Sequence, residues 1–310
     1  MIRAAINWRI NFLHQQYLKL CWDVKRLLDF SKKEKINSIS VIVVGRNDNY
    51  GGDFSLRLQT TLDWNLKHLP NPELIYVEWN QIKERPSNCN WIAERYPNAK
   101  CYIVPDEIHR NIAANPDKIP VMEYFAKNFG IRKASNDWIL LINADCFIGY
   151  DVITKINKLN PYTIYGTHYI SIKWDGKPIS DYHLQNKNLI TIAFSADKTM
   201  SSVVGNFIFT HKRNWMKATG YDERLNDTRA GVDTNGLYQL LHFGLKPMVL
   251  GHHFHLDHPE SIVNTGNPTH GDSSIIDKNQ IISYKNSDGW GLINYPLKQI
   301  SERIWELQPI

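Results

Sequence analysis

The feature that most constrains the fold is a regular alternation of short apolar runs with helical patterns between residues 39 and 142. The first run, residues 39–44, is continuous and rich in β-branched side chains, and it ends in a polar turn that begins at Gly45. Such a run is typical of a parallel strand that is buried on both faces. Similar runs follow at residues 74–77, 101–104 and 138–142.

Helical patterns fill the spaces between these runs. Apolar residues recur at helical spacing from Phe54 to Leu66, around Trp91 and Tyr96, and across residues 124–134. This alternation predicts an α/β fold with a doubly wound, mostly parallel sheet flanked by helices. Ligands of such sheets bind outside the carboxyl ends of the strands.

Beyond residue 150 the pattern is less regular. The polar stretch at residues 264–274 predicts a loop that either closes over a substrate or is a surface excursion. Apolar residues spaced by three and four near the end of the chain predict a closing helix. The expected elements are strands at residues 163–172, 190–194 and 203–209, a helix at residues 237–243, and a closing helix that carries Leu297, Ile300, Ile304 and Leu307.

Residues 1–35 have the pattern of one long amphipathic helix with basic flanks, in which apolar side chains recur at alternating spacings of four and three. Three interpretations remain open: the helix packs on the protein's own body, forms the seam of a homodimer, or lies on a membrane as a peripheral anchor. The apolar stripe consists of Ile6, Ile10, Leu13, Tyr17, Leu20, Val24 and Leu27.

Composition and charge narrow the class of protein. The 310 residues are 43% hydrophobic and 22% charged, a mix typical of soluble globular proteins. The net charge of +5 is too small and dispersed to predict nucleic-acid binding, although it suits an anionic ligand. The four cysteines are far apart, which argues against a disulfide framework or a thiolate zinc site. No apolar run is long enough to cross a bilayer, so we expect a cytoplasmic protein, either free or peripheral to a membrane.

Acidic side chains stand where the predicted strands end. Asp48 follows the first strand, Glu78 the second and Asp145 the fourth, and Asp233 precedes the helix at residues 237–243. Each one alone is also typical of a turn or a helix cap. Together they predict a functional site at the ligand-binding edge of the sheet.

The order of these motifs resembles that of the GT-A glycosyltransferases, and within them glycosyltransferase family 2. Residues 39–48 are similar to the nucleotide-binding strand that opens such enzymes, and residues 73–80 to their second strand with its terminal acid. Residues 126–134 look like the helix before the metal motif, and residues 137–145 like the strand that ends in Asp-x-Asp. The resemblance implies a Rossmann-like GT-A domain at residues 37–258, preceded by the helix of residues 1–36 and followed by a loop and helix extension.

Two departures from the family pattern accompany the resemblance. The metal motif reads Asn143-Ala144-Asp145, so its first acid is replaced. Residues 220–223 and 230–234 resemble the Gly-Phe-Asp-Glu and Glu-Asp segment of the family, with Val232 in place of the Glu. A Mn²⁺ or Mg²⁺ ion is commonly held by one or two carboxylates plus substrate phosphates, so Asp145 with a further ligand suffices chemically.

The resemblance also implies roles for individual residues. Glu78 and Asp48 would hold the nucleoside, and Asn143 occupies the position that contacts the ribose. Asp145 would hold the cation. Asp233 aligns with the general base of inverting members, although an N-cap, or a nucleophile in a retaining enzyme, stays open as an alternative. Arg46 and Lys127 are candidates for phosphate contacts, with solvated side chains as the alternative.

The segment His252-His253-Phe254-His255-Leu256-Asp257-His258 holds several candidate metal ligands. In an extended segment His253, His255 and Asp257 would share one face, with His258 on the other. A histidine after the catalytic acid often supplies the last metal ligand of GT-A enzymes, so we expect His255 as a ligand, with His253, Asp257 and His258 as supporting or substitute ligands. The string also matches the metal motif of metallo-β-lactamase-like hydrolases, although these place it early in the chain.

The resulting hypothesis is a metal-dependent transferase of the hexosyl or N-acetylhexosaminyl type, which moves a sugar from a nucleotide-diphosphate donor to a glycan or other hydroxyl acceptor. The resemblance implies a UDP-sugar as donor and inversion at the sugar, in an enzyme of glycan or polysaccharide biosynthesis. Three alternatives remain: a metallohydrolase, a nucleotidyltransferase, and a catalytically silent nucleotide-sugar-binding protein.

Overall fold

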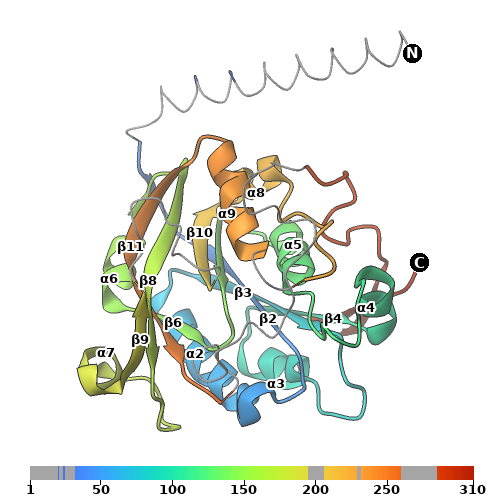
Figure 1. The fold of residues 1–310 in the computed structure, drawn as a ribbon, viewed down its shortest axis with the longest axis horizontal. Coiled ribbons are helices and arrows are strands. Elements are labelled where there is room, and N and C mark those ends of the chain that lie inside the picture. The colour runs from blue at the N-terminus through green and yellow to red at the C-terminus, as the bar shows by residue number, and fades with distance from the viewer. Residues whose placement is uncertain (1–19, 21–23, 25–31, 195–205, 229–231, 260–284) are drawn as a thin grey trace.

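The computed structural model describes residues 20, 24, 32–194, 206–228, 232–259 and 285–310 (Figure 1). The helix predicted for residues 1–35 lies largely outside them, and so does the loop predicted at residues 264–274. Within the described residues no helix combines the length and the hydropathy that crossing a membrane requires. The described helices are short and connect the strands. They are η1 (Tyr50–Gly52), α2 (Phe54–His68), α3 (Asn88–Arg95), α4 (Asp106–Ile112), α5 (Glu123–Lys133), α6 (Tyr150–Lys155), α7 (Asp181–Gln185), η2 (Lys187–Leu189), α8 (Lys212–Ala218) and α9 (Val232–His242).

The described strands form one large sheet and a two-stranded ribbon, and the large sheet has the order β12-β13-β4-β3-β2-β5-β10-β8-β11-β6, with β9 paired to β8. Neighbours from β13 to β5 pair in parallel, as do β8 and β11, whereas β10 runs antiparallel to both β5 and β8. The strands are β1 (Glu34–Lys35), β2 (Ile39–Gly45), β3 (Pro72–Trp79), β4 (Ala99–Val104), β5 (Trp138–Ile142), β6 (Cys146–Ile148), β7 (Lys158–Leu159), β8 (Thr163–Ile172), β9 (Ile190–Phe194), β10 (Phe207–His211), β11 (Lys246–Leu256), β12 (Leu297–Ser301) and β13 (Ile304–Leu307).

Apolar side chains on the two faces of the sheet build two cores. Val41 and Val43 of β2 pack with α2 and α3, and Ile42 of the same strand packs with α5 and α8 on the opposite face. Figure 1 shows α5, α8 and α9 on one side of the sheet and α2 and α3 on the other. Both faces of β2 are covered and all seven of its residues are buried, which fits a sequence that is apolar except for Ser40. The predicted α/β class with a sheet between helices is confirmed.

Most strand and helix predictions agree with the structure, and the end of the chain is an exception. Residues predicted as a closing helix form the hairpin β12–β13, in which Leu297 pairs with Leu307. The parallel pairing of β13 with β4 then brings this hairpin into the sheet. The prediction of a C-terminal helix was therefore wrong, because spacings of three and four also occur when two strands face each other across a short turn.

A second correction concerns the end of the segment predicted as the first helix. Glu34 and Lys35 are a short strand, β1, which pairs with Leu159 and Lys158 of β7. Ile36 is buried in the core. Leu20 and Val24, the two described residues of the predicted apolar stripe, are helical and exposed.

Candidate functional site

Asp145 lies where the central strand β5 gives way to β6, after Ile142 and before Cys146. Its backbone carbonyl accepts a hydrogen bond from the backbone N–H of Leu256, the last residue of β11, at 2.9 Å. This bond brings the end of the His-rich strand to the carboxyl end of β5. The sheet therefore places side chains from two distant parts of the chain at one edge.

Three side chains converge there: Asp145, His255 and His258. They form a candidate site for a metal ion, which we call the metal centre. Their ligand atoms all lie within 4.8 Å of one another. Nε2 of His255 is 3.5 Å and Nε2 of His258 is 3.3 Å from Oδ2 of Asp145. Within the described ranges this is the one group of three or more His, Cys, Asp or Glu side chains so arranged.

The position of His258 differs from the sequence-based expectation. Strict alternation would put His258 on the face opposite His255, but β11 ends at Leu256. The backbone N–H of Asp257 still bonds to Ile172 at the end of β8, after which the chain turns. Because the alternation stops with the strand, His258 joins His255 at the metal centre.

The charge state of Asp145 follows from its neighbours. Burial acts to raise the pKa of this carboxyl, but the charge of His255 and hydrogen bonds from His255 and His258 outweigh it and hold the pKa well below its ordinary value. Asp145 is thus a carboxylate at neutral pH. A carboxylate facing two imidazole nitrogens is a donor set that suits a divalent transition-metal ion.

His253, also expected among the ligands, lies outside the metal centre. Its Nδ1 hydrogen-bonds to Oγ1 of Thr167 at 2.7 Å, and its ring stacks on Phe207 with centroids 5.9 Å apart. Burial, followed by the charge of His255, lowers the pKa of His253 to about 3. The structure therefore places His253 as a neutral side chain of the core beside the centre.

The turn after β2 closes over the metal centre. The ring of Tyr50 meets that of His258 edge to face, with centroids 4.8 Å apart. The fully buried guanidinium of Arg57 pairs with Asp53 and donates to the carbonyl of Tyr50 at 2.6 Å. Sequence reasoning missed Tyr50 and Arg57, although the Gly51-Gly52 pair beside them signals a turn with an unusual backbone.

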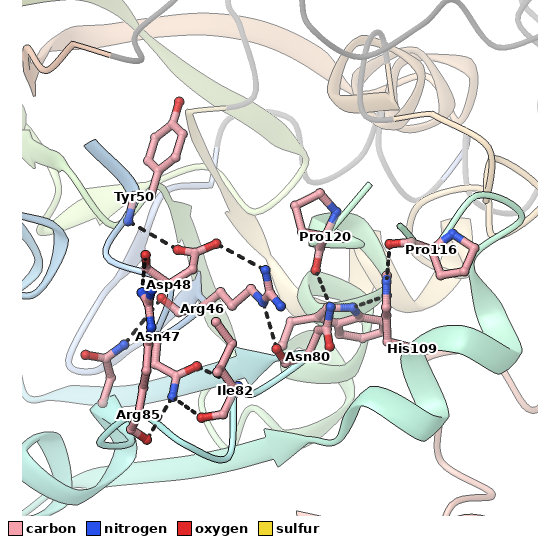
Figure 2. Close-up of polar contacts among 12 residues, drawn as sticks. Arg46, Asn47, Asp48, Tyr50, Asn80, Ile82, Arg85, His109, Pro116 and Pro120 are labelled. Atoms are coloured by element: carbon pink, nitrogen blue, oxygen red, sulfur yellow. Dashed lines mark hydrogen bonds and ion pairs between the residues drawn. The ribbon is translucent and has the colours of Figure 1, made fainter. Parts of the chain in front are cut away.

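The same turn carries Arg46 and Asp48, as Figure 2 shows. Nε of Arg46 donates to the carbonyl of Asn80 at 2.8 Å, and its Nη1 lies 3.4 Å from Oδ2 of Asp48. The two side chains are 20% and 25% exposed, so both are partly open to solvent. Asn47 binds the backbone of Ile82 through both ends of its amide and so fixes the turn against the segment after β3.

Glu78 has a different position from the one expected of a nucleoside ligand. The residue is 0% exposed, and its carboxylate accepts hydrogen bonds from the hydroxyl of Ser87 and from the backbone N–H of Asn88, the latter at 2.8 Å. Burial raises the pKa of Glu78 against the effect of these bonds. Its carboxylate holds the first turn of α3 and does not reach the surface of the described structure.

Lys127 and Asn143 meet beneath the edge of the sheet. Nζ of Lys127 lies 2.6 Å from Oε1 of Glu123 and donates to Oδ1 of Asn143 at 3.2 Å. The amide of Asn143 donates in turn to Oδ1 of Asn206 at 3.2 Å. Asn143, which replaces the first acid of the Asp-x-Asp motif, therefore belongs to a polar network that includes the buried side chain of Lys127.

Asp233 lies at the second position of α9, and its side chain is outside the described part of the structure. Near it in sequence, Glu223 accepts hydrogen bonds from Asn128 at 2.9 Å and from the backbone N–H of Gly291 at 2.8 Å. These bonds fasten the Gly-Tyr-Asp-Glu segment to α5 and to the C-terminal segment. Trp290 is buried there, and the guanidinium of Arg132 lies over its ring.

Neither a protein-family model nor a curated protein sequence matches this chain. Among solved structures, S. aureus TarS 1-349 aligns with a TM-score of 0.44 and 12% identity, covering 71% of this chain and 60% of that one. Mannosyltransferase PcManGT from Pyrobaculum calidifontis, in complex with GDP-Man and Mn²⁺, aligns with a TM-score of 0.43 and 14% identity, covering 75% and 62%. The glycosyltransferase GlyE of Streptococcus pneumoniae TIGR4 aligns with a TM-score of 0.36 and 11% identity, covering 69% and 45%.

This chain thus matches less than two thirds of the length of each of these three structures. All three TM-scores are below 0.5 and all identities are 14% or less. The chemistry of this chain must therefore be judged from its own side chains.

Proposed function

We propose that this chain is a metal-dependent glycosyltransferase that moves a sugar from a nucleotide-diphosphate donor to a hydroxyl acceptor. The observation that carries the proposal is the metal centre at the carboxyl end of β5, with the turn of Arg46 and Asp48 closing over it through Tyr50. In α/β sheets this edge is where ligands bind. A cation site beside partly exposed basic and acidic groups fits a ligand that joins a nucleoside to a diphosphate.

The donor set favours Mn²⁺ over Mg²⁺. Mg²⁺ prefers oxygen ligands and keeps several waters, whereas imidazole nitrogens suit transition metals. Asp145 would supply one oxygen, and His255 and His258 would each supply Nε2, the atoms that face one another in the structure. The chemistry that such an ion supplies is neutralisation of the charge on the leaving diphosphate.

We assign the remaining roles to the turn after β2 and to α9. Arg46 and Asp48 would bind the nucleoside end of the donor, which we expect to be a UDP-sugar. Asp233 would accept the proton of the acceptor hydroxyl, whose oxygen attacks the anomeric carbon as the bond to the diphosphate oxygen breaks, with inversion. This role for Asp233 rests on the resemblance of residues 220–234 to the family motif.

The proposal is tested by incubating the purified chain with common UDP- and GDP-sugars, with and without Mn²⁺, and measuring the nucleoside diphosphate released. We expect release with at least one donor, and loss of release in Asp145→Asn and His258→Gln. Asp151→Asn is the matched control, because its carboxylate pairs with His252 at 2.6 Å outside the metal centre.

Four results would contradict the proposal or a part of it. Absence of release from every donor in a folded sample rejects transfer, and release of pyrophosphate from a nucleoside triphosphate and a sugar phosphate would favour a nucleotidyltransferase. Equal activity in Asp145→Asn and Asp151→Asn rejects the metal centre. Asp233→Asn should bind nucleotide and Mn²⁺ but not transfer, and full transfer by that variant removes Asp233 from the mechanism.

A further inference from the structure

Two buried hydroxyl groups on β8 each bind a histidine of β11. Oγ1 of Thr167 lies 2.7 Å from Nδ1 of His253, and Oγ of Ser171 lies 3.0 Å from Nδ1 of His255. The two strands run in parallel, and Ser171 is directly paired with His255. Both hydroxyl residues are at most 2% exposed, so water does not compete for these contacts.

The Ser171 contact has a consequence for the other nitrogen of the His255 ring. A neutral imidazole carries one N–H, and its second nitrogen has a lone pair. Since Nε2 of His255 faces Asp145 at 3.5 Å, it can act as a ligand only when the proton is on Nδ1, the atom that Ser171 binds. In that tautomer Nδ1–H is the donor, and Oγ of Ser171, 3.0 Å away, is the acceptor.

Tyr169 supports the same ring from its face. Its ring stacks on that of His255, with centroids 5.7 Å apart and planes 29° apart. Stacking limits how far the imidazole can tilt but permits it to flip by half a turn, which would put Cδ2 in the place of Nδ1 and Cε1 in the place of Nε2. The hydrogen bond to Ser171 is the contact that distinguishes the two orientations.

We propose that Ser171 is a positioning residue of the metal centre: it accepts a hydrogen bond from Nδ1–H of His255 and thereby fixes the tautomer and ring orientation in which Nε2 is a metal ligand. This inference rests on the proposed function, since it requires that the centre binds a metal ion. Partners of this kind, which orient a ligand without touching the ion, typically change metal affinity about 10- to 100-fold when they are removed.

Thr167 and His253 show that a hydroxyl–imidazole pair alone does not make a metal ligand. Their hydrogen bond, at 2.7 Å, is shorter than that of Ser171 with His255, at 3.0 Å. His253 is nevertheless outside the metal centre. Thr167→Val therefore removes the same type of bond one histidine away, and it serves as the matched control for Ser171→Ala.

The test is a Mn²⁺ titration followed by the electron paramagnetic resonance signal of the free ion, with the fold of each variant checked by circular dichroism. We expect Ser171→Ala to weaken Mn²⁺ binding by about 10-fold or more. Ser171→Thr, which keeps the hydroxyl, should bind within a few-fold of the wild type, and Thr167→Val should bind like the wild type. If Ser171→Ala does not fold, Ser171→Cys has nearly the same shape with a weaker hydrogen bond and should show the same loss.

The outcomes separate this inference from the proposed function. Wild-type affinity in a folded Ser171→Ala or Ser171→Cys variant, or an equal loss in Thr167→Val, overturns the positioning role while the metal centre stands. A wild-type chain that binds no Mn²⁺, or an Asp145→Asn variant that binds it normally, overturns the metal centre and with it the role of Ser171.

Discussion

The backbone of Gly51 lies directly against the imidazole ring of His258. A Cβ atom on Gly51 would come within 2.8 Å of Nδ1 of His258 and of Nη2 of Arg57. The φ angle of Gly51 is +69°, in the left-handed region that residues with a Cβ atom rarely adopt. The turn after β2 can therefore seat His258 at the metal centre only with a glycine at this position.

We predict that Gly51→Ala weakens Mn²⁺ binding about 10-fold or more, because the new methyl group must displace His258 or Arg57. Gly52→Ala is the matched control, since Gly52 has a φ of +89° but a Cβ atom added there would have no neighbour within 4 Å. Both variants should lose a similar amount of stability from the backbone, about 1 kcal/mol. Calorimetric titration with Mn²⁺ measures the difference, and equal affinities in the two variants would show that the contact with His258 is unimportant.

The ligands of the metal centre predict which ion stabilises the fold. A ligand that binds only the native state at a concentration about 100 times its dissociation constant adds about 2.7 kcal/mol of stability. With two imidazoles in the site, we expect Mn²⁺ to raise the melting temperature at concentrations where Mg²⁺ has little effect. Thermal unfolding with each ion and after chelation tests this. A larger shift with Mg²⁺, or an undiminished Mn²⁺ shift in Asp145→Asn, would argue against the assigned ligands.

Strands and helices that follow from the local spacing of apolar residues were predictable from the sequence. The strand predicted at residues 163–172 agrees with β8. The family resemblance, and not local pattern, implied that Asp145 and His255 share a site, and the structure brings the two side chains together. The hairpin β12–β13 was not predictable, because its pairing with β4 depends on contacts far away in the sequence. His258 was placed on the wrong face because alternation gives no information on where a strand ends.

Buried polar contacts were also beyond the sequence. Glu78 lies at the carboxyl end of β3, one residue before the strand ends, but nothing local indicates that Ser87 and Asn88 would bind its carboxylate. Ser171 is one of several polar residues that alternate along β8, and only its pairing with His255 distinguishes it. Such roles arise from tertiary contacts, which a single sequence does not reveal.

Lys127 should contribute strongly to stability although it lies next to the site. Its side chain is 1% exposed and its Nζ binds both Glu123 and Asn143. Lys127→Met leaves these two acceptors without their buried donor, and loss of one partner of a buried pair costs about 3 kcal/mol or more. Lys133→Met on the same helix is the control, since Lys133 is only partly buried. Urea denaturation compares the two free energies of unfolding, and equal losses would contradict a special role for the Lys127 network.

The pH dependence of stability should reflect His211, which caps α8. Its Nδ1 accepts a hydrogen bond from the backbone N–H of Arg213 at 3.2 Å, which requires an unprotonated nitrogen. Burial, followed by the charge of Arg213, lowers the pKa of His211 to about 4, and the charge of Asp137 acts in the opposite direction. Glu34 also faces the ring, with Oε2 4.0 Å from Nε2, but this does not prevent the net lowering.

Because the pKa is lowered in the folded state, the unfolded chain binds a proton at a higher pH than the native protein does. Stability is then unaffected by His211 above about pH 6.5 and falls as the pH decreases from there to about 4. Between about pH 7.5 and about pH 5 the loss is about 2 kcal/mol. His211→Asn retains a favoured N-cap without a titrating group. The free energy of unfolding of this variant should therefore fall by about 2 kcal/mol less than that of the wild type between the two pH values. Urea unfolding of both proteins at the two pH values, in the presence of a chelator, gives the comparison, and identical losses in the two proteins would exclude His211 as the titrating group.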